Sequence, residues 1–126
     1  MQKQANKRVL AVVSDLFFMA KIGEAAKHAG IPVEFVTAEK EVLEKAKTAP
    51  LVIILDLNLD AVHPLRLIGK LKASPELKSI RLIGYLSHVQ AELKQKAQEA
   101  GCDMVMPRSA FSMNLPVILK RHAGTP

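Results

Sequence analysis

The sequence feature that most constrains the fold is the apolar run 51–55, which ends at Asp56. It reads Leu-Val-Ile-Ile-Leu, with three β-branched residues, and Pro50 precedes it. A short, unbroken apolar run of this kind indicates a strand buried on both faces, as in a parallel sheet between two layers of helices. Ligands of open α/β sheets bind beyond the carboxyl ends of the strands, so Asp56 is the first candidate for a reacting or metal-binding group.

Strand and helix patterns alternate along the rest of the chain. Apolar runs predict strands, and apolar residues at helical spacing predict the helices between them. This alternation predicts an α/β fold, a doubly wound parallel sheet with helices on both faces. The predicted strands cover residues 8–14, 33–36, 51–56, 80–86 and 103–106, and the predicted helices cover 16–29, 38–47, 64–73, 87–100 and 114–122.

Residues with known preferences mark several helix ends. Gly30 suits a helix C-terminus, and Pro64 suits the first turn of a helix. Thr37 is placed to cap the second helix, and Ser87 precedes Gln90 by three residues, which is the spacing of a capping box. Helix capping alone would account for Ser87.

Length and composition predict one globular domain covering residues 1–126, with a basic tail at 1–7 and a second tail at 123–126. No apolar run is long enough to span a bilayer, and the first apolar segment is too short for a signal peptide. The single cysteine, Cys102, cannot form an internal disulfide and is expected in the core beside a turn. These features predict a cytoplasmic protein with no membrane partner.

The formal net charge is +6, from 18 basic and 12 acidic residues. The basic residues are spread over every predicted element, without the interleaved aromatic residues typical of single-strand binders. We therefore interpret them as solvated helix faces, and a basic nucleic-acid-associated module remains a remote alternative. The histidines lie in different elements and are expected at the surface; they are His28, His63, His88 and His122.

Polar side chains follow four of the five predicted strands. Because the carboxyl ends of parallel strands meet at one edge of a sheet, we expect these side chains to lie close together. Such a cluster of acids with a cation indicates a functional site. Its members are Ser14 and Asp15 after the first strand, Asp56 and Asn58 after the third, Ser87 after the fourth and Arg108 after the fifth.

This pattern resembles the receiver domain of response regulators in bacterial two-component signalling. The resemblance covers the whole chain and includes the loop 74–77 (Ser-Pro-Glu-Leu) and the turn 100–103 (Ala-Gly-Cys-Asp). It implies a flavodoxin-like (βα)5 fold with strand order 2-1-3-4-5. It also implies a protein partner, either a histidine kinase or a downstream signalling protein, and no enzymatic activity of its own.

The resemblance assigns roles to individual residues. Asp56 matches the phosphoacceptor, and Asp15 matches the second acid of a pair that binds Mg²⁺ together with Asp56. Asn58 matches the residue whose carbonyl completes the metal site. Ser87 matches the switch hydroxyl, and Arg108 stands where a lysine would hold the phosphoryl oxygens.

Two of these positions depart from the receiver pattern. Ser14 replaces the first acid of the pair, which should weaken Mg²⁺ binding because the ion prefers charged oxygen ligands. Arg108 replaces the lysine, and this exchange is not conservative. We expect Arg108 either to bind phosphate or to pair permanently with Asp56 and hold it ionised. Leu16 and Phe17 cannot both face inward, so they either cover the site or face a partner.

These departures favour a stand-alone, receiver-like module of a phosphorelay that acts by protein docking. Its docking surface is expected near Leu16 or Leu67 and would serve a partner or a homodimer. The alternative is a fully working regulator, phosphorylated on Asp56 in a Mg²⁺-dependent reaction. A small enzyme is disfavoured because no Gly-rich turn follows the first strand and no Cys/His or Ser/His pair is suitably placed.

Overall fold

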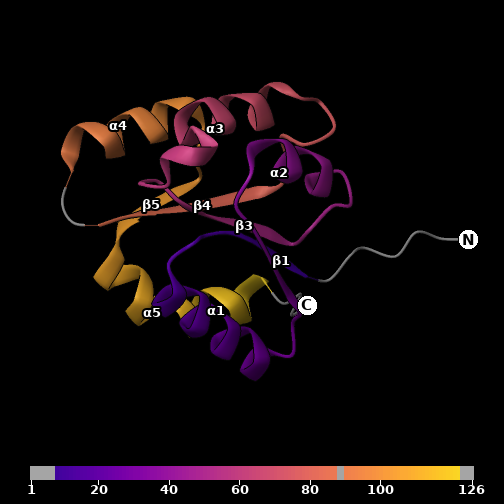
Figure 1. Cartoon of the computed structure of the whole chain (residues 1–126), viewed down its shortest axis with the longest axis vertical. Coiled ribbons are helices and arrows are strands. Elements are labelled where there is room, and N and C mark those ends of the chain that lie inside the picture. Colours follow the sequence, from indigo (N-terminus) through magenta and orange to yellow (C-terminus); the bar gives the residue numbers. More distant parts are fainter. Residues whose placement is uncertain (1–7, 88–89, 123–126) are drawn as a thin grey trace, which may run out of the picture.

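The computed structural model describes residues 8–87 and 90–122, which form a parallel sheet between two layers of helices (Figure 1). The predicted tails, together with His88 and Val89, lie outside the described residues. The strand order β2-β1-β3-β4-β5 confirms the predicted flavodoxin-like topology. The strands are β1 (Val9–Val12), β2 (Val33–Val36), β3 (Val52–Asp56), β4 (Arg81–Leu86) and β5 (Met104–Pro107).

The helices divide between the two faces of the sheet. Two of them pack on one face and three on the other, as Figure 1 shows. The first face carries α1 (Leu16–Ala29) and α5 (Arg108–His122). The second carries α2 (Glu39–Ala46), α3 (Pro64–Ala73) and α4 (Ala91–Ala100), with the 3-10 helix η1 (Asp60–Val62) leading into α3.

Each face has its own hydrophobic core, because side chains alternate along the strands. Toward α1 and α5 the core includes three aromatic rings, Phe18, Tyr85 and Phe111, in a continuous stack. Toward α2, α3 and α4 the core residues are aliphatic apart from Cys102, which is buried as predicted. All five residues of β3 are buried, so the central strand is in contact with both cores.

Two of the four predicted helix-end signals are confirmed. Gly30 adopts a left-handed conformation, with φ 73°, and ends α1. Pro64 is the first residue of α3. Thr37 does not cap α2, because the helix begins one residue later than expected and Ala38 holds the cap position. Ser87 does not cap α4 either, since this helix begins at Ala91 with Gln90 before it.

The last helix is longer than predicted. α5 begins at Arg108 instead of Asn114 and contains Pro116 in its interior. An interior proline removes a backbone hydrogen bond and costs about 3 kcal/mol in an isolated helix. The helix continues through it because one side is fully packed against α1 and the sheet; the buried residues of that side are Phe111, Leu115, Ile118 and Leu119.

The two positions near which a docking surface was expected differ in their exposure. Leu16 is 79% exposed and Phe17 is 64% exposed, so both face outward at the start of α1, as expected. Leu67 is fully buried in the core under α3, and the prediction of a docking surface around it was wrong. None of the helices in the described part of the chain is long and apolar enough to cross a membrane.

Candidate functional site at the carboxyl ends of the strands

Asp56 ends β3 and is 7% exposed. One of its carboxylate oxygens, Oδ1, accepts a hydrogen bond of 2.9 Å from the backbone N–H of Asn58. Burial raises the pKa of Asp56, because a desolvated carboxylate is disfavoured; the Asn58 N–H and the charge of Arg108 oppose this, and the charge of Asp15 adds to it. The site therefore favours the protonated form of Asp56 more than water does.

Asp15 caps the N-terminus of α1 with its side chain. Its Oδ1 accepts hydrogen bonds from the backbone N–H groups of Phe17, at 2.8 Å, and Phe18, at 3.2 Å. Aspartate is a preferred residue at this position because it satisfies donors that the helix leaves unpaired. Ser14 beside it is exposed. The acid that remains of the predicted pair is thus already bonded to the protein.

The side chain of Asn58 connects the ends of two neighbouring strands. Its Oδ1 accepts a hydrogen bond of 2.7 Å from the backbone N–H of Ser87, just after β4. Its Nδ2 donates a bond of 3.1 Å to Oε1 of Gln90, just before α4. Since the backbone of Asn58 also bonds Asp56, this residue joins the candidate carboxylate to the start of α4.

Arg108 lies at the start of α5 and stacks on an aromatic ring. Its guanidinium carbon is 5.2 Å from the centroid of the Phe18 ring, which is a cation–π geometry. Among the ion pairs of the described residues there is none between Arg108 and Asp56, and the buried Nε of Arg108 has no hydrogen-bond partner there. The expected permanent pair is therefore wrong, as is the expectation that it would hold Asp56 ionised.

Tyr85 is a site residue that the sequence interpretation missed. It pairs with Asp56 across β3 and β4 and is fully buried. Its ring stacks on Phe18, with centroids 4.9 Å apart, and on Phe111, at 4.7 Å. The charges of Asp56, Arg108 and Asp15 all act on its hydroxyl, which has no hydrogen-bond partner within the described residues. Burial is the main reason that its pKa is raised.

A cavity of about 480 Å³ opens beside this site. Three serine hydroxyls and the Arg108 guanidinium give it polar walls, and two phenylalanine rings give it an apolar one. Asp56 is not among its lining residues, which are Phe17, Phe18, Ser87, Pro107, Arg108, Ser109 and Ser112. Of the three stacked rings, Phe18 lines this cavity.

The predicted site residues come together at the carboxyl ends of the strands. Hydrogen bonds link Asp56, Asn58 and Ser87, and the charges of Asp15 and Arg108 reach Asp56. No group of three or more His, Cys, Asp or Glu side chains in the described residues could hold a metal ion. Ser14 offers a neutral hydroxyl where the pattern has an acid, and Oδ1 of Asp15 caps α1, so the cluster carries less negative charge than a pair of free acids would; Mg²⁺ prefers charged oxygen ligands.

Solved structures with the same fold are response regulators. A response regulator from Hahella chejuensis matches with a TM-score of 0.83 and 20% sequence identity, covering 94% of this chain and 96% of that chain. The chemotaxis response regulator CheY4 of Vibrio cholerae matches with a TM-score of 0.78 and 22% identity, over 92% and 98% of the two chains. The chain thus has the fold of a response regulator receiver domain.

A third similar structure carries a modification and a metal ion. It is a response regulator protein from Burkholderia pseudomallei with a phosphorylated aspartic acid and a calcium ion. It matches with a TM-score of 0.75 and 19% identity, covering 93% of this chain and 68% of that chain. No protein-family model and no curated protein matches the sequence.

Proposed function

We propose that this chain is a receiver-like signalling module of a phosphorelay that acts by binding another protein, with impaired phosphorylation chemistry at Asp56. The observation that carries the proposal is the state of the acid pair. Ser14 replaces one member, and the carboxylate of Asp15 already bonds two N–H groups of α1. The fold is retained while the charge that would hold a metal ion is reduced.

The placement of Arg108 supports the same proposal. A cation that holds phosphoryl oxygens on Asp56 has to point toward that carboxylate, whereas Arg108 stacks on Phe18. In this proposal the module has no enzymatic activity, works in the cytoplasm, and binds a histidine kinase or a downstream signalling protein.

The alternative, a working regulator, has one specific observation in its favour. Asp56 ends β3, Asn58 follows the same strand and Ser87 follows the neighbouring strand β4, and an aspartic acid is phosphorylated in the similar Burkholderia pseudomallei protein. The two candidates differ in one measurable property, which is formation of an acyl phosphate on Asp56 in the presence of Mg²⁺.

The test is incubation with acetyl phosphate and Mg²⁺, followed by intact mass spectrometry. We expect no adduct on the wild-type protein. The substitution Ser14→Asp restores the acid pair, and the double substitution Ser14→Asp with Arg108→Lys restores both departing positions. An adduct on either variant that disappears with Asp56→Asn would support an impaired metal site as the cause.

A matched control adds the same negative charge elsewhere. Ser79 is exposed in the loop before β4, so Ser79→Asp should leave the protein unreactive. A rapid adduct on the wild-type protein would contradict the docking proposal and establish the working regulator. Failure of both restoring variants would show that Ser14 and Arg108 do not explain the missing reaction.

A further inference from the structure

A second polar pocket lies at the other end of the sheet from Asp56. It forms where β4 and β5 begin and α5 ends, and its volume is about 130 Å³. A water molecule takes up ~30 Å³ in the liquid, so the pocket is large enough for one small ion with some water and too small for a drug-sized ligand. Its lining residues are Arg81, Ile83, Asp103, Met104, Arg121 and His122.

Positive charge dominates this pocket. Arg81 comes from β4 and Arg121 from α5, and neither has an acidic partner within residues 8–87 and 90–122. The acid that lines the pocket, Asp103, is already engaged: its Oδ2 accepts bonds from Nζ of Lys72, at 3.1 Å, and from the backbone N–H of Leu82, at 2.8 Å. The two guanidinium groups, on exposed residues, therefore share the pocket with a carboxylate that is bonded to Lys72 and not to either of them.

Arg81 and Arg121 line the same pocket as His122, and their charges act on its imidazole. Its pKa is lowered first by burial and then by the positive charges of Arg81 and Arg121. Basic residues at the end of a helix are often explained by the helix dipole alone. That explanation suits Arg121 and His122, but it does not account for Arg81, which reaches the same pocket from the sheet.

We propose that the pocket formed by Arg81, Arg121 and His122 binds one phosphate group, either as inorganic phosphate or as part of a small phosphomonoester. Two guanidinium groups from different elements can each donate to different oxygens of a tetrahedral anion, and such charge-assisted bonds are strong and directional. An imidazole at the third side donates to the anion once it is protonated. The site is separate from Asp56 and does not depend on the function proposed for it.

The test is a titration of the ¹⁵N-labelled protein with inorganic phosphate, monitored by NMR. Saturable shifts are expected, largest at the amides of Arg81, Met104, Arg121 and His122. The double variant Arg81→Gln with Arg121→Gln should bind at least about tenfold more weakly, because each substitution removes a charge-assisted bond. A parallel titration with glycerol phosphate identifies the source: tighter binding points to a monoester, and equal binding to the phosphate group itself.

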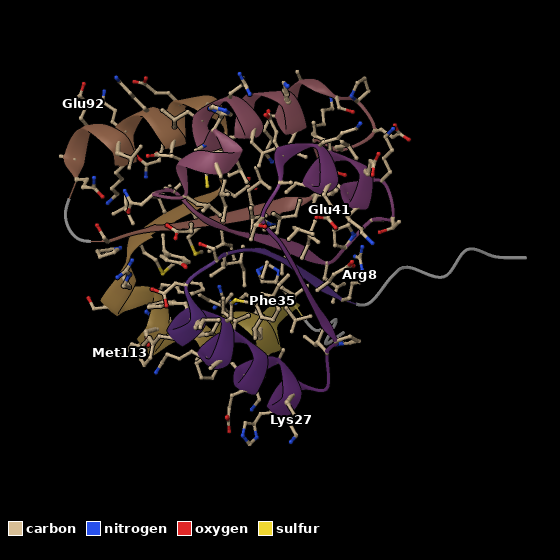
Figure 2. All side chains as sticks on the ribbon, in the orientation of Figure 1. Arg8, Lys27, Phe35, Glu41, Glu92 and Met113 are labelled. Carbon is tan, nitrogen blue, oxygen red and sulfur yellow. The ribbon has the colours of Figure 1, made fainter. Side chains whose placement is uncertain are left out.

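The control variant removes the same charge from another face. Lys27 and Lys94 are exposed on α1 and α4, and Lys27 points away from the molecule in Figure 2. Lys27→Gln with Lys94→Gln should leave phosphate affinity unchanged. Shifts that do not saturate, or that are equal in all variants, would show only a diffuse ionic atmosphere and would overturn the proposal.

A pH series with sulfate tests the role of His122, because sulfate stays a dianion throughout. A bound anion raises the pKa of His122, so binding takes up a proton and affinity should rise as pH falls from about 7.5 to about 5.5. The other charged groups facing His122 are Arg81, Arg121, and Asp103 with its partner Lys72. His122→Gln should bind sulfate with a flat pH profile, and a slope retained in that variant would contradict the assignment.

Discussion

The two faces of the sheet are built from different side chains. Under α2, α3 and α4 the core is aliphatic, with Leu67, Ile68 and Leu71 of α3 packed on the strands. Under α1 and α5 the core contains the stacked rings of Phe18, Tyr85 and Phe111. The core of the aliphatic face includes the buried thiol of Cys102, whose pKa is raised by burial, whereas the aromatic face leads directly to Asp56 and Arg108.

The difference shows that the residues that mainly stabilise the fold can lie on one face of the sheet and the residues of the candidate site on the other. Aliphatic residues fill space without hydrogen-bonding demands, so that face needs only complementary shape. The aromatic face carries a buried phenol and a buried guanidinium nitrogen that have no partners among the described residues. Unpaired polar atoms lower stability, and they are tolerated at sites where something else is to be bound. The aromatic face should therefore be the more sensitive one to changes at Asp56.

The largest effect that sharpens this comparison is expected from Phe111→Ala. Removing the end ring of the stack should lower the free energy of unfolding by about 3–5 kcal/mol and should also shift the pKa of Asp56, because the rings shield the site from water. Leu71→Ala on the other face is the control, with a loss of about 2–5 kcal/mol. Chemical denaturation and ¹³C NMR of the Asp56 carboxyl measure both quantities, and an equal pKa change in the two variants would remove the distinction between the faces.

Asp56→Asn should give a smaller effect, in the opposite direction. Asparagine keeps an acceptor for the Asn58 N–H and removes the buried charge, so the variant should gain roughly 1–3 kcal/mol at pH 7. The pKa of Asp56 is raised on folding, so between its value in the unfolded chain and its value in the folded protein the folded state holds a proton that the unfolded chain has released. The free energy of unfolding of the wild type therefore falls as the pH rises between these two values. The gain should therefore shrink toward about pH 4. Denaturation at several pH values checks this, and a gain independent of pH would rule out the charge as its cause.

The smallest predicted effect belongs to Tyr85→Phe. The substitution keeps the stacked ring and removes a buried hydroxyl that has no partner in the described structure, so stability should rise by about 1 kcal/mol. Thermal and chemical denaturation measure the change. A loss of stability would mean that the Tyr85 hydroxyl is hydrogen-bonded in solution, for example to water. The buried hydroxyl would then not destabilise the aromatic face.

Most of the fold could be predicted from the sequence because its signals are local. The run 51–55 predicted the central strand, and Gly30 and Pro64 marked helix ends that the structure confirms. The start of the last helix was predicted at Asn114, whereas α5 begins at Arg108. Only the packing of Phe111 against the sheet, a contact between distant parts of the chain, shows that the helix begins earlier.

The sequence predicted which residues form the candidate site better than it predicted what their side chains contact. Strand ends located Asp15, Asp56, Asn58 and Arg108, but the direction of each side chain depends on neighbours from other elements. Arg108 stacks on Phe18 from α1, a preference that no residue near Arg108 in the sequence indicates. Tyr85 could have been found, because strand alternation places it beside Asp56 on the same face.

The amide of Asn58 has a mechanical consequence. It holds the residue after β4 and the residue before α4 through separate bonds, while its own backbone is bonded to Asp56. A change in the charge of the Asp56 carboxylate, or in what is bound to it, would be transmitted through the hydrogen bonds of Asn58 to the residues that lead into α4. Hydrogen exchange at the amide of Ser87 would then report events at Asp56.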